Sequence, residues 1–154
     1  MTRIVVVTSI AAPPERVFDC ALDVGLHLGS AAGTGERVVE GRTSGRFEMG
    51  EEVTWEARHL GLRRRMTVRI TGVERPRWFR DEQVARRGPF ASFVHDHHFE
   101  PAAGGTRMRD ELVFRAPFGP LGRIADALVV GPHMRRFLTE RARFLKDAAE
   151  RGEG

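Results

Sequence analysis

The chain has 154 residues, of which 41% are hydrophobic and 30% charged, a composition typical of one globular domain with its own core. Its formal charge is only +4, and because Lys146 is the single lysine, the sequence pI of about 10.7 reflects arginine usage and not a large positive excess. Cys20 is the only cysteine, which excludes an internal disulfide and a cysteine-based metal cluster.

The N-terminal segment "MTRIVVVTSI" has one basic residue and a short apolar run. It lacks the apolar length and the small-residue cleavage site of an export signal. No apolar run in the chain approaches the roughly 18 residues of a spanning helix. We therefore expect a single domain over residues 1–154, located in the cytoplasm and without a membrane span.

Residues 2–10 are rich in β-branched side chains and predict a strand. A short helix is expected next, because Pro13 or Pro14 suits its first turn and apolar residues recur at helical spacing at Val17, Phe18, Ala21 and Leu22. Residues 24–35, "VGLHLGSAAGTG", predict a second short helix with a glycine-rich exit.

Six further strands are predicted, separated by turns that carry Gly or Pro. They cover residues 36–41, 51–59, 64–74, 77–84, 92–100 and 106–115.

The chain ends in a predicted helix from about residue 120 to residue 150. Apolar residues recur along it, and Gly131 and Pro132 predict a kink or a break. We expect it to cover the apolar face of the sheet and to bury Leu121, Leu128, Leu138 and Leu145 there.

Four stretches together extend over almost the whole chain: "SIAAPPERVFD", "GPFASFVHDHHFEPAAGGTRMRDELVF", "PFGPLGRIADAL" and "LTERARFLK". They resemble bacterial members of the START-like (SRPBCC, helix-grip) superfamily, of the polyketide cyclase/dehydrase-like kind. The resemblance implies an α+β helix-grip fold. In this fold a curved antiparallel sheet of about seven strands wraps on a long C-terminal helix, with two short helices after the first strand and an internal cavity. Members bind or transform many apolar molecules, so the resemblance implies the fold more strongly than the chemistry.

Alternation along the strands predicts which side chains face the core. In "FVHDHHFE" the inward set is Phe93, His95, His97 and Phe99, while Asp96 and His98 face solvent. The same reasoning turns these other residues inward: Trp55, Met66, Val68, Phe79, Asp81, Gln83, Met108, Asp110 and Leu112.

The turn "PAAGG" suggests a register for the last hairpin. Pairing Phe99 with Thr106 places His97 opposite Met108 and His95 opposite Asp110. Directly opposed residues have Cβ atoms about 4.5–5.5 Å apart. The sequence thus predicts an inward His95–Asp110 pair on an otherwise apolar face.

Four interpretations of this pair remain open. His95, His97 and Asp110 have the ligand types of an open zinc site, but His-x-His is common by chance and the resemblance suggests no metal, so we predict no bound metal and no cofactor. A buried His–Asp pair could perform general acid–base catalysis in an aldol cyclisation or a dehydration. It could instead orient a mostly apolar ligand, or be a hydrogen-bonded structural pair.

Arg141 lies within the apolar stripe of the last helix. A stripe arginine extends its head to the edge of the core or finds a carboxylate. Asp110 and Asp81 are the inward acids within reach, and an ion pair between helix and sheet is favoured over a ligand contact.

The run Arg63–Arg65 could contact nucleic acid, but no basic stripe with interleaved aromatic residues accompanies it. We interpret it as a solvated strand end and expect no specific nucleic-acid partner. The glycine-rich stretches do not join a strand to a helix as a phosphate loop does, and no serine has a nucleophile-elbow context.

The sequence therefore predicts a monomer or homodimer that binds a small hydrophobic or aromatic molecule, lipid or polyketide-like, in an internal cavity. One alternative is a polyketide cyclase or dehydratase that uses His95 and Asp110, and another is a scaffold or regulator whose core is filled by its own side chains. The expected ligand-binding residues are Trp55, Met66, Val68, Phe79, Asp81, Phe93, His95, His97, Asp110, Leu112, Met134, Leu138 and Arg141.

Overall fold

The computed structural model describes residues 1–152. Their seven strands form one antiparallel sheet in the order β1-β7-β6-β5-β4-β3-β2. The strands are β1 (Thr2–Ile10), β2 (Arg37–Glu40), β3 (Glu52–His59), β4 (Leu62–Glu74), β5 (Trp78–Gln83), β6 (Ser92–Ala102) and β7 (Gly105–Arg115).

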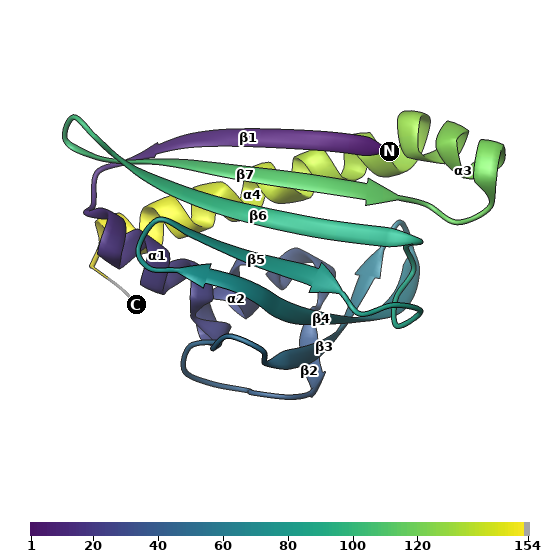
Figure 1. The fold of residues 1–154 in the computed structure, drawn as a ribbon, viewed down its shortest axis with the longest axis horizontal. Helices are drawn as coiled ribbons and strands as arrows, with labels where there is room; N and C mark the ends of the chain where they lie inside the picture. Colours follow the sequence, from purple (N-terminus) through teal and green to yellow (C-terminus); the bar gives the residue numbers. More distant parts are fainter. Residues whose placement is uncertain (153–154) are drawn as a thin grey trace.

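Helices α1 (Pro14–Leu22) and α2 (Val24–Ser30) follow β1, and a short 3₁₀ turn, η1 (Ala32–Thr34), leads into β2. The C-terminal helical segment comprises α3 (Gly119–Ala125), a π-helical turn η2 (Asp126–Val130) and α4 (Gly131–Glu150). Helix α4 runs behind the curved sheet, and α1 and α2 lie on the same side of the sheet, where both contact α4 (Figure 1). The architecture is the predicted α+β helix-grip fold.

The burial patterns of the strands and of α4 explain how the sheet and the helix pack together. Strands β6 and β7 bury every second side chain, so one face of the sheet is apolar and needs a cover. Helix α4 supplies that cover, because Leu138 and Leu145 are buried on its inner face as predicted.

The prediction that Leu121 and Leu128 are buried is wrong, because their exposed fractions are 74% and 72%. Helix α3 lies at one end of the molecule, where it extends past the strands (Figure 1). The apolar stripe therefore continues along the sequence beyond the part of the sheet that could cover it.

The predicted kink at Gly131 and Pro132 also takes a different form. The helix does not break there, and the distortion is the π-helical turn η2, which ends just before Gly131. A Cβ at Gly131 would lie 2.6 Å from the carbonyl oxygen of Asp126, so glycine permits this close approach. The buried Asp126 carboxylate accepts a hydrogen bond from the Ala116 amide at 2.9 Å, which ties the turn to the end of β7.

Candidate functional site: a cavity with a polar floor

A cavity of about 480 Å³ lies between the sheet and the C-terminal helix. Side chains from α2, β3, β4, β5, β6 and α4 line it, together with the segment between β7 and α3. Most of the wall is apolar, and the polar lining includes His27, Glu36, Asp81, His95 and Arg141. This combination is typical of a site that encloses an apolar molecule and orients it through few polar contacts.

The structure brings most of the predicted ligand-binding residues to this cavity. Those that line it are Trp55, Met66, Val68, Asp81, Phe93, His95, Met134, Leu138 and Arg141. Phe79 and His97 line a smaller void of about 30 Å³, which shares His27, Trp55, Val68, Asp81 and Arg141 with the main cavity. Asp110 and Leu112 are buried but line neither space.

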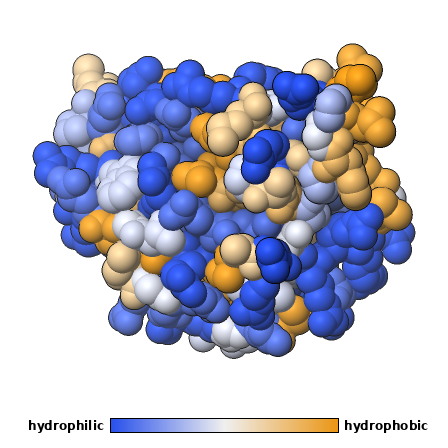
Figure 2. Space-filling model, turned by 45° about the vertical axis from the view of Figure 1, so that its right-hand side comes forward, coloured by the Kyte–Doolittle hydropathy of each residue, from blue (hydrophilic) through white to orange (hydrophobic). Residues whose placement is uncertain are grey.

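The rim of the cavity carries apolar side chains that are open to solvent. Leu60 and Leu62 at the β3–β4 turn, and Phe118 and Leu121 at the start of α3, line the cavity and are all more than half exposed. Figure 2 shows orange apolar surface gathered on the side of the molecule that bears α3. Helical periodicity singled out Leu121 alone among these four residues, as a buried residue, and could not show that the four surround an opening.

The predicted register of the β6–β7 hairpin is wrong by two residues. Pro101, and not Phe99, pairs with Thr106, so His97 lies opposite Asp110 and His95 lies opposite Leu112. The strands continue farther into the turn than "PAAGG" suggested, because Ala102 and Gly105 still pair. The shift is an even number of residues, so each side chain keeps the predicted face.

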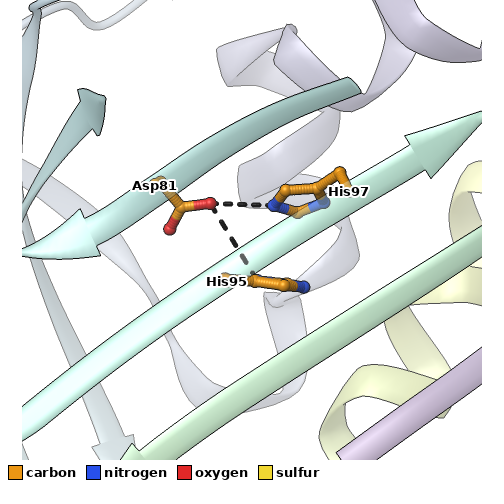
Figure 3. A group of neighbouring side chains, drawn as sticks. All are labelled: Asp81, His95 and His97. Atoms are coloured by element: carbon orange, nitrogen blue, oxygen red, sulfur yellow. Dashed lines mark hydrogen bonds and ion pairs between the residues drawn. The ribbon is translucent and has the colours of Figure 1, made fainter. Parts of the chain in front are cut away.

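The polar floor of the cavity includes Asp81 and His95, which belong to a cluster of two histidines and two aspartates completed by His97 and Asp110 behind them. The ring of His97 lies between the two carboxylates, with Nε2 2.8 Å from Asp81 Oδ1 and Nδ1 3.0 Å from Asp110 Oδ1. His95 Nε2 lies 3.2 Å from Asp110 Oδ1, and its Nδ1 lies 4.0 Å from Asp81 Oδ1. Figure 3 shows Asp81 on β5 facing both histidines of β6.

The contacts of the His97 ring indicate its protonation state. Both ring nitrogens face carboxylate oxygens, and a neutral imidazole could donate to only one of them. Burial would lower the pKa of His97, but the hydrogen bonds to Asp110 and Asp81 outweigh burial and raise its pKa. The same contacts lower the pKa of both Asp81 and Asp110 despite their burial. His97 is therefore best described as an imidazolium held between two aspartates.

His95 differs from His97 although it lies two residues away. Burial and the positive charge of His97 lower its pKa, so the neutral ring is favoured at neutral pH. With Nε2 donating to Asp110, the lone pair of the neutral ring is on Nδ1. His95 is the histidine of the cluster that lines the main cavity, and Asp110 lies behind it.

Among residues 1–152, Asp81, His95 and His97 form a group that could hold a metal ion. One ligand atom from each lies within 4.8 Å of the others, and Asp110 contacts the remaining nitrogen of both rings, as an outer carboxylate does in many metal sites. The metal set considered from the sequence had Asp110 in place of Asp81. A metal here would have to replace the proton shared by His97 and Asp81, which already form a hydrogen bond.

Arg141 was expected to pair with Asp81 or Asp110, and this prediction is wrong. Within residues 1–152 no carboxylate oxygen lies within 4.0 Å of its guanidinium, and its hydrogen bond is from Nη2 to His27 Nδ1 at 3.2 Å. Asp81 and Asp110 are instead bound to His97. The Arg141 side chain is buried, and its Nε has no hydrogen-bond partner among residues 1–152.

His27 connects Arg141 to a second buried acid that the sequence did not reveal. Its Nδ1 must accept from Arg141, which has no acceptor, so its Nε2–H donates to Glu36 Oε1 at 2.5 Å. Burial and the charge of Arg141 lower the pKa of His27, while the hydrogen bond from His27 outweighs burial and lowers the pKa of Glu36. The His27 ring also stacks on Trp55, with ring centroids 4.1 Å apart.

Arg63, Arg64 and Arg65 lie at the start of β4 and are exposed, and Arg64 also lines the cavity. Arg63 and Arg65, with Arg37 of β2, donate to Glu56 of β3. Hydrogen bonds from Arg37, Arg65 and Arg63 lower the pKa of Glu56 to about 2, so this carboxylate stays ionised and offsets part of the local positive charge.

Comparison with protein families identifies the class of protein that this fold and cavity define. Residues 1–150 match the family described as polyketide cyclase / dehydrase and lipid transport, so the chain belongs to this family. Comparison with curated proteins found no significant match. None of the helices within residues 1–152 combines the length and the apolarity needed to cross a membrane.

Solved structures share the fold over nearly their whole length. TTHA0849 from Thermus thermophilus has a TM-score of 0.79 at 20% identity, and the match covers 99% of this chain and 100% of TTHA0849. Ms6760 from Mycobacterium smegmatis has a TM-score of 0.72 at 15% identity, with coverage of 98% and 92%. CV1439 from Chromobacterium violaceum has a TM-score of 0.71 at 17% identity, with coverage of 97% and 99%. At these identities the likeness concerns the fold alone.

Proposed function

We propose that the protein binds a small, mostly apolar molecule in the cavity between its sheet and α4. The observation that carries this proposal is the cavity itself, about 480 Å³ in volume, with apolar walls and polar groups confined to a few positions. Apolar side chains at the rim offer an apolar ligand a path from solvent to the interior. Membership of a family that includes lipid transport agrees with this proposal.

A second candidate is cyclase or dehydratase activity, because His95 lines the cavity with Asp110 behind it. A neutral imidazole whose second nitrogen is held by a carboxylate can accept a proton from a bound molecule. In an aldol cyclisation His95 would remove a proton next to a carbonyl group, and Asp110 would stabilise the imidazolium that forms. This role needs the same bound ligand, so it adds a chemical step to the first candidate.

The third possibility from the sequence was a regulator with a filled core. The cavity argues against a filled core, because the chain's own side chains leave about 480 Å³ open. Ordinary packing defects in protein cores are far smaller than this.

Native mass spectrometry of freshly purified protein tests ligand binding directly. We expect a copurified molecule, or uptake of the neutral fluorophore N-phenyl-1-naphthylamine with enhanced fluorescence. Ala57 is buried and lines the cavity, so Ala57→Trp should fill part of it and abolish both signals. Arg143→Trp, on the exposed face of α4, is the matched control. Equal binding by wild type and Ala57→Trp would place the fluorophore outside the cavity and contradict the proposal.

A further inference from the structure

Arg141 carries a buried charge that the contacts within the described structure compensate only in part, and an apolar ligand would not compensate it either. A guanidinium is always charged, and a buried charge is costly unless a counter-charge or hydrogen bonds compensate it. Arg141 has an exposed fraction of 9%, yet the structure shows one side-chain hydrogen bond for it, to the neutral His27 ring. Its Nε–H, which is buried, has no partner among the described residues.

The acids nearest to Arg141 are engaged elsewhere. Asp81 Oδ1 accepts from His97, and Glu36 Oε1 accepts from His27. Neither carboxylate comes within 4.0 Å of the guanidinium in the described structure. Turning the Asp81 carboxylate toward Arg141 would break its contact with His97, so residues 1–152 supply no direct counter-ion without the loss of another buried pair.

The position of Arg141 indicates that a bound ligand could supply the missing hydrogen-bond acceptor for its guanidinium. Arg141 lines both the main cavity and the smaller void, so it lies where the two meet. Phe90, Phe93 and Phe137 line other parts of the main cavity and give an apolar molecule a place for its body. A ligand with one polar end and one apolar end fits this division.

We propose that Arg141 is the anchor of an acidic ligand, and that the cavity takes an apolar molecule bearing one carboxylate. This inference rests on the proposed binding function and names the class of ligand. The planar fork of guanidinium N–H groups matches the two oxygens of a carboxylate. A monoanion suits the site better than a phosphate dianion, because Asp81 and Glu36 also line the cavity and would repel the second charge.

A matched pair of ligands separates this anchor from apolar binding in general. Decanoic acid and 1-decanol have the same chain length and differ in the anionic group, and each can be titrated against bound N-phenyl-1-naphthylamine at pH 7.5. For the wild type we expect the acid to displace the fluorophore at a lower concentration than the alcohol. For Arg141→Met we expect the acid to weaken by about 10-fold or more, which is the usual effect of losing a charge-assisted hydrogen bond. The alcohol and the fluorophore should keep their affinities within about threefold.

Two further variants control for folding and for charge. Arg141→Lys keeps the positive charge without the fork, and it should fold and retain part of the preference for the acid. Arg143→Met removes a charge from the exposed face of the same helix and should leave that preference unchanged.

The outcomes distinguish the two proposals. One outcome contradicts the role of Arg141 and leaves the binding function intact. In it the fluorophore binds, but decanoic acid and 1-decanol displace it equally well from the wild type, or the affinities of both ligands fall by the same factor in Arg141→Met and in Arg141→Lys. If neither the fluorophore nor the two ligands bind the wild type, both proposals are wrong.

Discussion

His97 and Asp110 face each other across β6 and β7, with His97 Nδ1 3.0 Å from Asp110 Oδ1. Both residues are buried, and the other nitrogen of the His97 ring lies 2.8 Å from Asp81. Neighbouring strands of the sheet thus hold one cation between two anions, directly behind the floor of an apolar cavity. Removing one member leaves a buried charge without compensation, which is the costly situation for such groups.

Stability should depend on pH through His97 in a definite direction. Its pKa is raised in the folded protein, so the stabilisation is fully present below the unfolded value of about 6.5 and is lost as pH rises through the folded value. His97→Gln should therefore lower the free energy of unfolding by about 1–3 kcal/mol at pH 6 and by less at pH 9. Urea denaturation of both proteins at the two pH values measures this difference.

His98→Gln is the control, because His98 lies on the other face of β6 and its pKa is lowered by burial. Its effect should not show the same decline toward high pH. A His97→Gln penalty that grows between pH 6 and pH 9 would mean that His97 is not held as a cation.

Alternation and turn residues predicted the order of the elements and the faces of the strands, while the helix-grip arrangement of those elements was implied by the resemblance to the START-like superfamily. The inward positions of His95, His97, Asp81 and Asp110 follow from the period of two along a strand, and the error of two residues in the β6–β7 register does not alter them. Register itself depends on how far the strands extend into the turn, and the sequence "EPAAGG" permits more than one answer. The predicted His95–Asp110 contact exists, but as a diagonal one.

Other features depend on contacts between residues far apart in the chain. His27 and Arg141 are 114 positions apart, and nothing local in "LHLGS" marks His27 as a partner for a buried guanidinium. The exposure of Leu121 and Leu128 depends on where the sheet ends beneath the helix, which the periodicity of the helix cannot show.

The purified protein should contain no stoichiometric transition metal. In the structure His97 donates to Asp81, and both histidines contact Asp110, so the cluster satisfies its own hydrogen bonds without an ion. Elemental analysis after dialysis tests this expectation. Near-stoichiometric zinc in the wild type that is lost in both His97→Ala and Asp81→Asn would show that the cluster is a metal site.

Binding to duplex DNA should be weak and independent of sequence. Glu56 accepts hydrogen bonds from Arg37, Arg63 and Arg65, so part of the arginine cluster is already neutralised on the protein. Fluorescence anisotropy with unrelated duplexes at physiological salt should give equal, low affinities that fall further as salt is added. A sequence-specific complex abolished by changing Arg63, Arg64 and Arg65 to alanine would contradict this prediction.

The last prediction separates the possible roles of His95 and Asp110. Asp110→Asn keeps the shape of the side chain and removes the charge that both histidines contact. A purely structural role predicts a loss of stability of about 1–3 kcal/mol, with an unchanged affinity for N-phenyl-1-naphthylamine or decanoic acid. An orienting role predicts a lower affinity for a polar ligand, while the neutral fluorophore still binds. A catalytic role predicts that turnover of an identified substrate collapses while its binding persists.

We expect the result of the orienting role, because His95 lines the cavity whereas Asp110 lies behind it and acts through the histidine. His95→Gln should then reproduce the loss of affinity with a smaller loss of stability, since it leaves the His97–Asp110 ion pair in place. If Asp110→Asn changes stability alone, and His95→Gln binds every ligand as the wild type does, the pair has only a structural role.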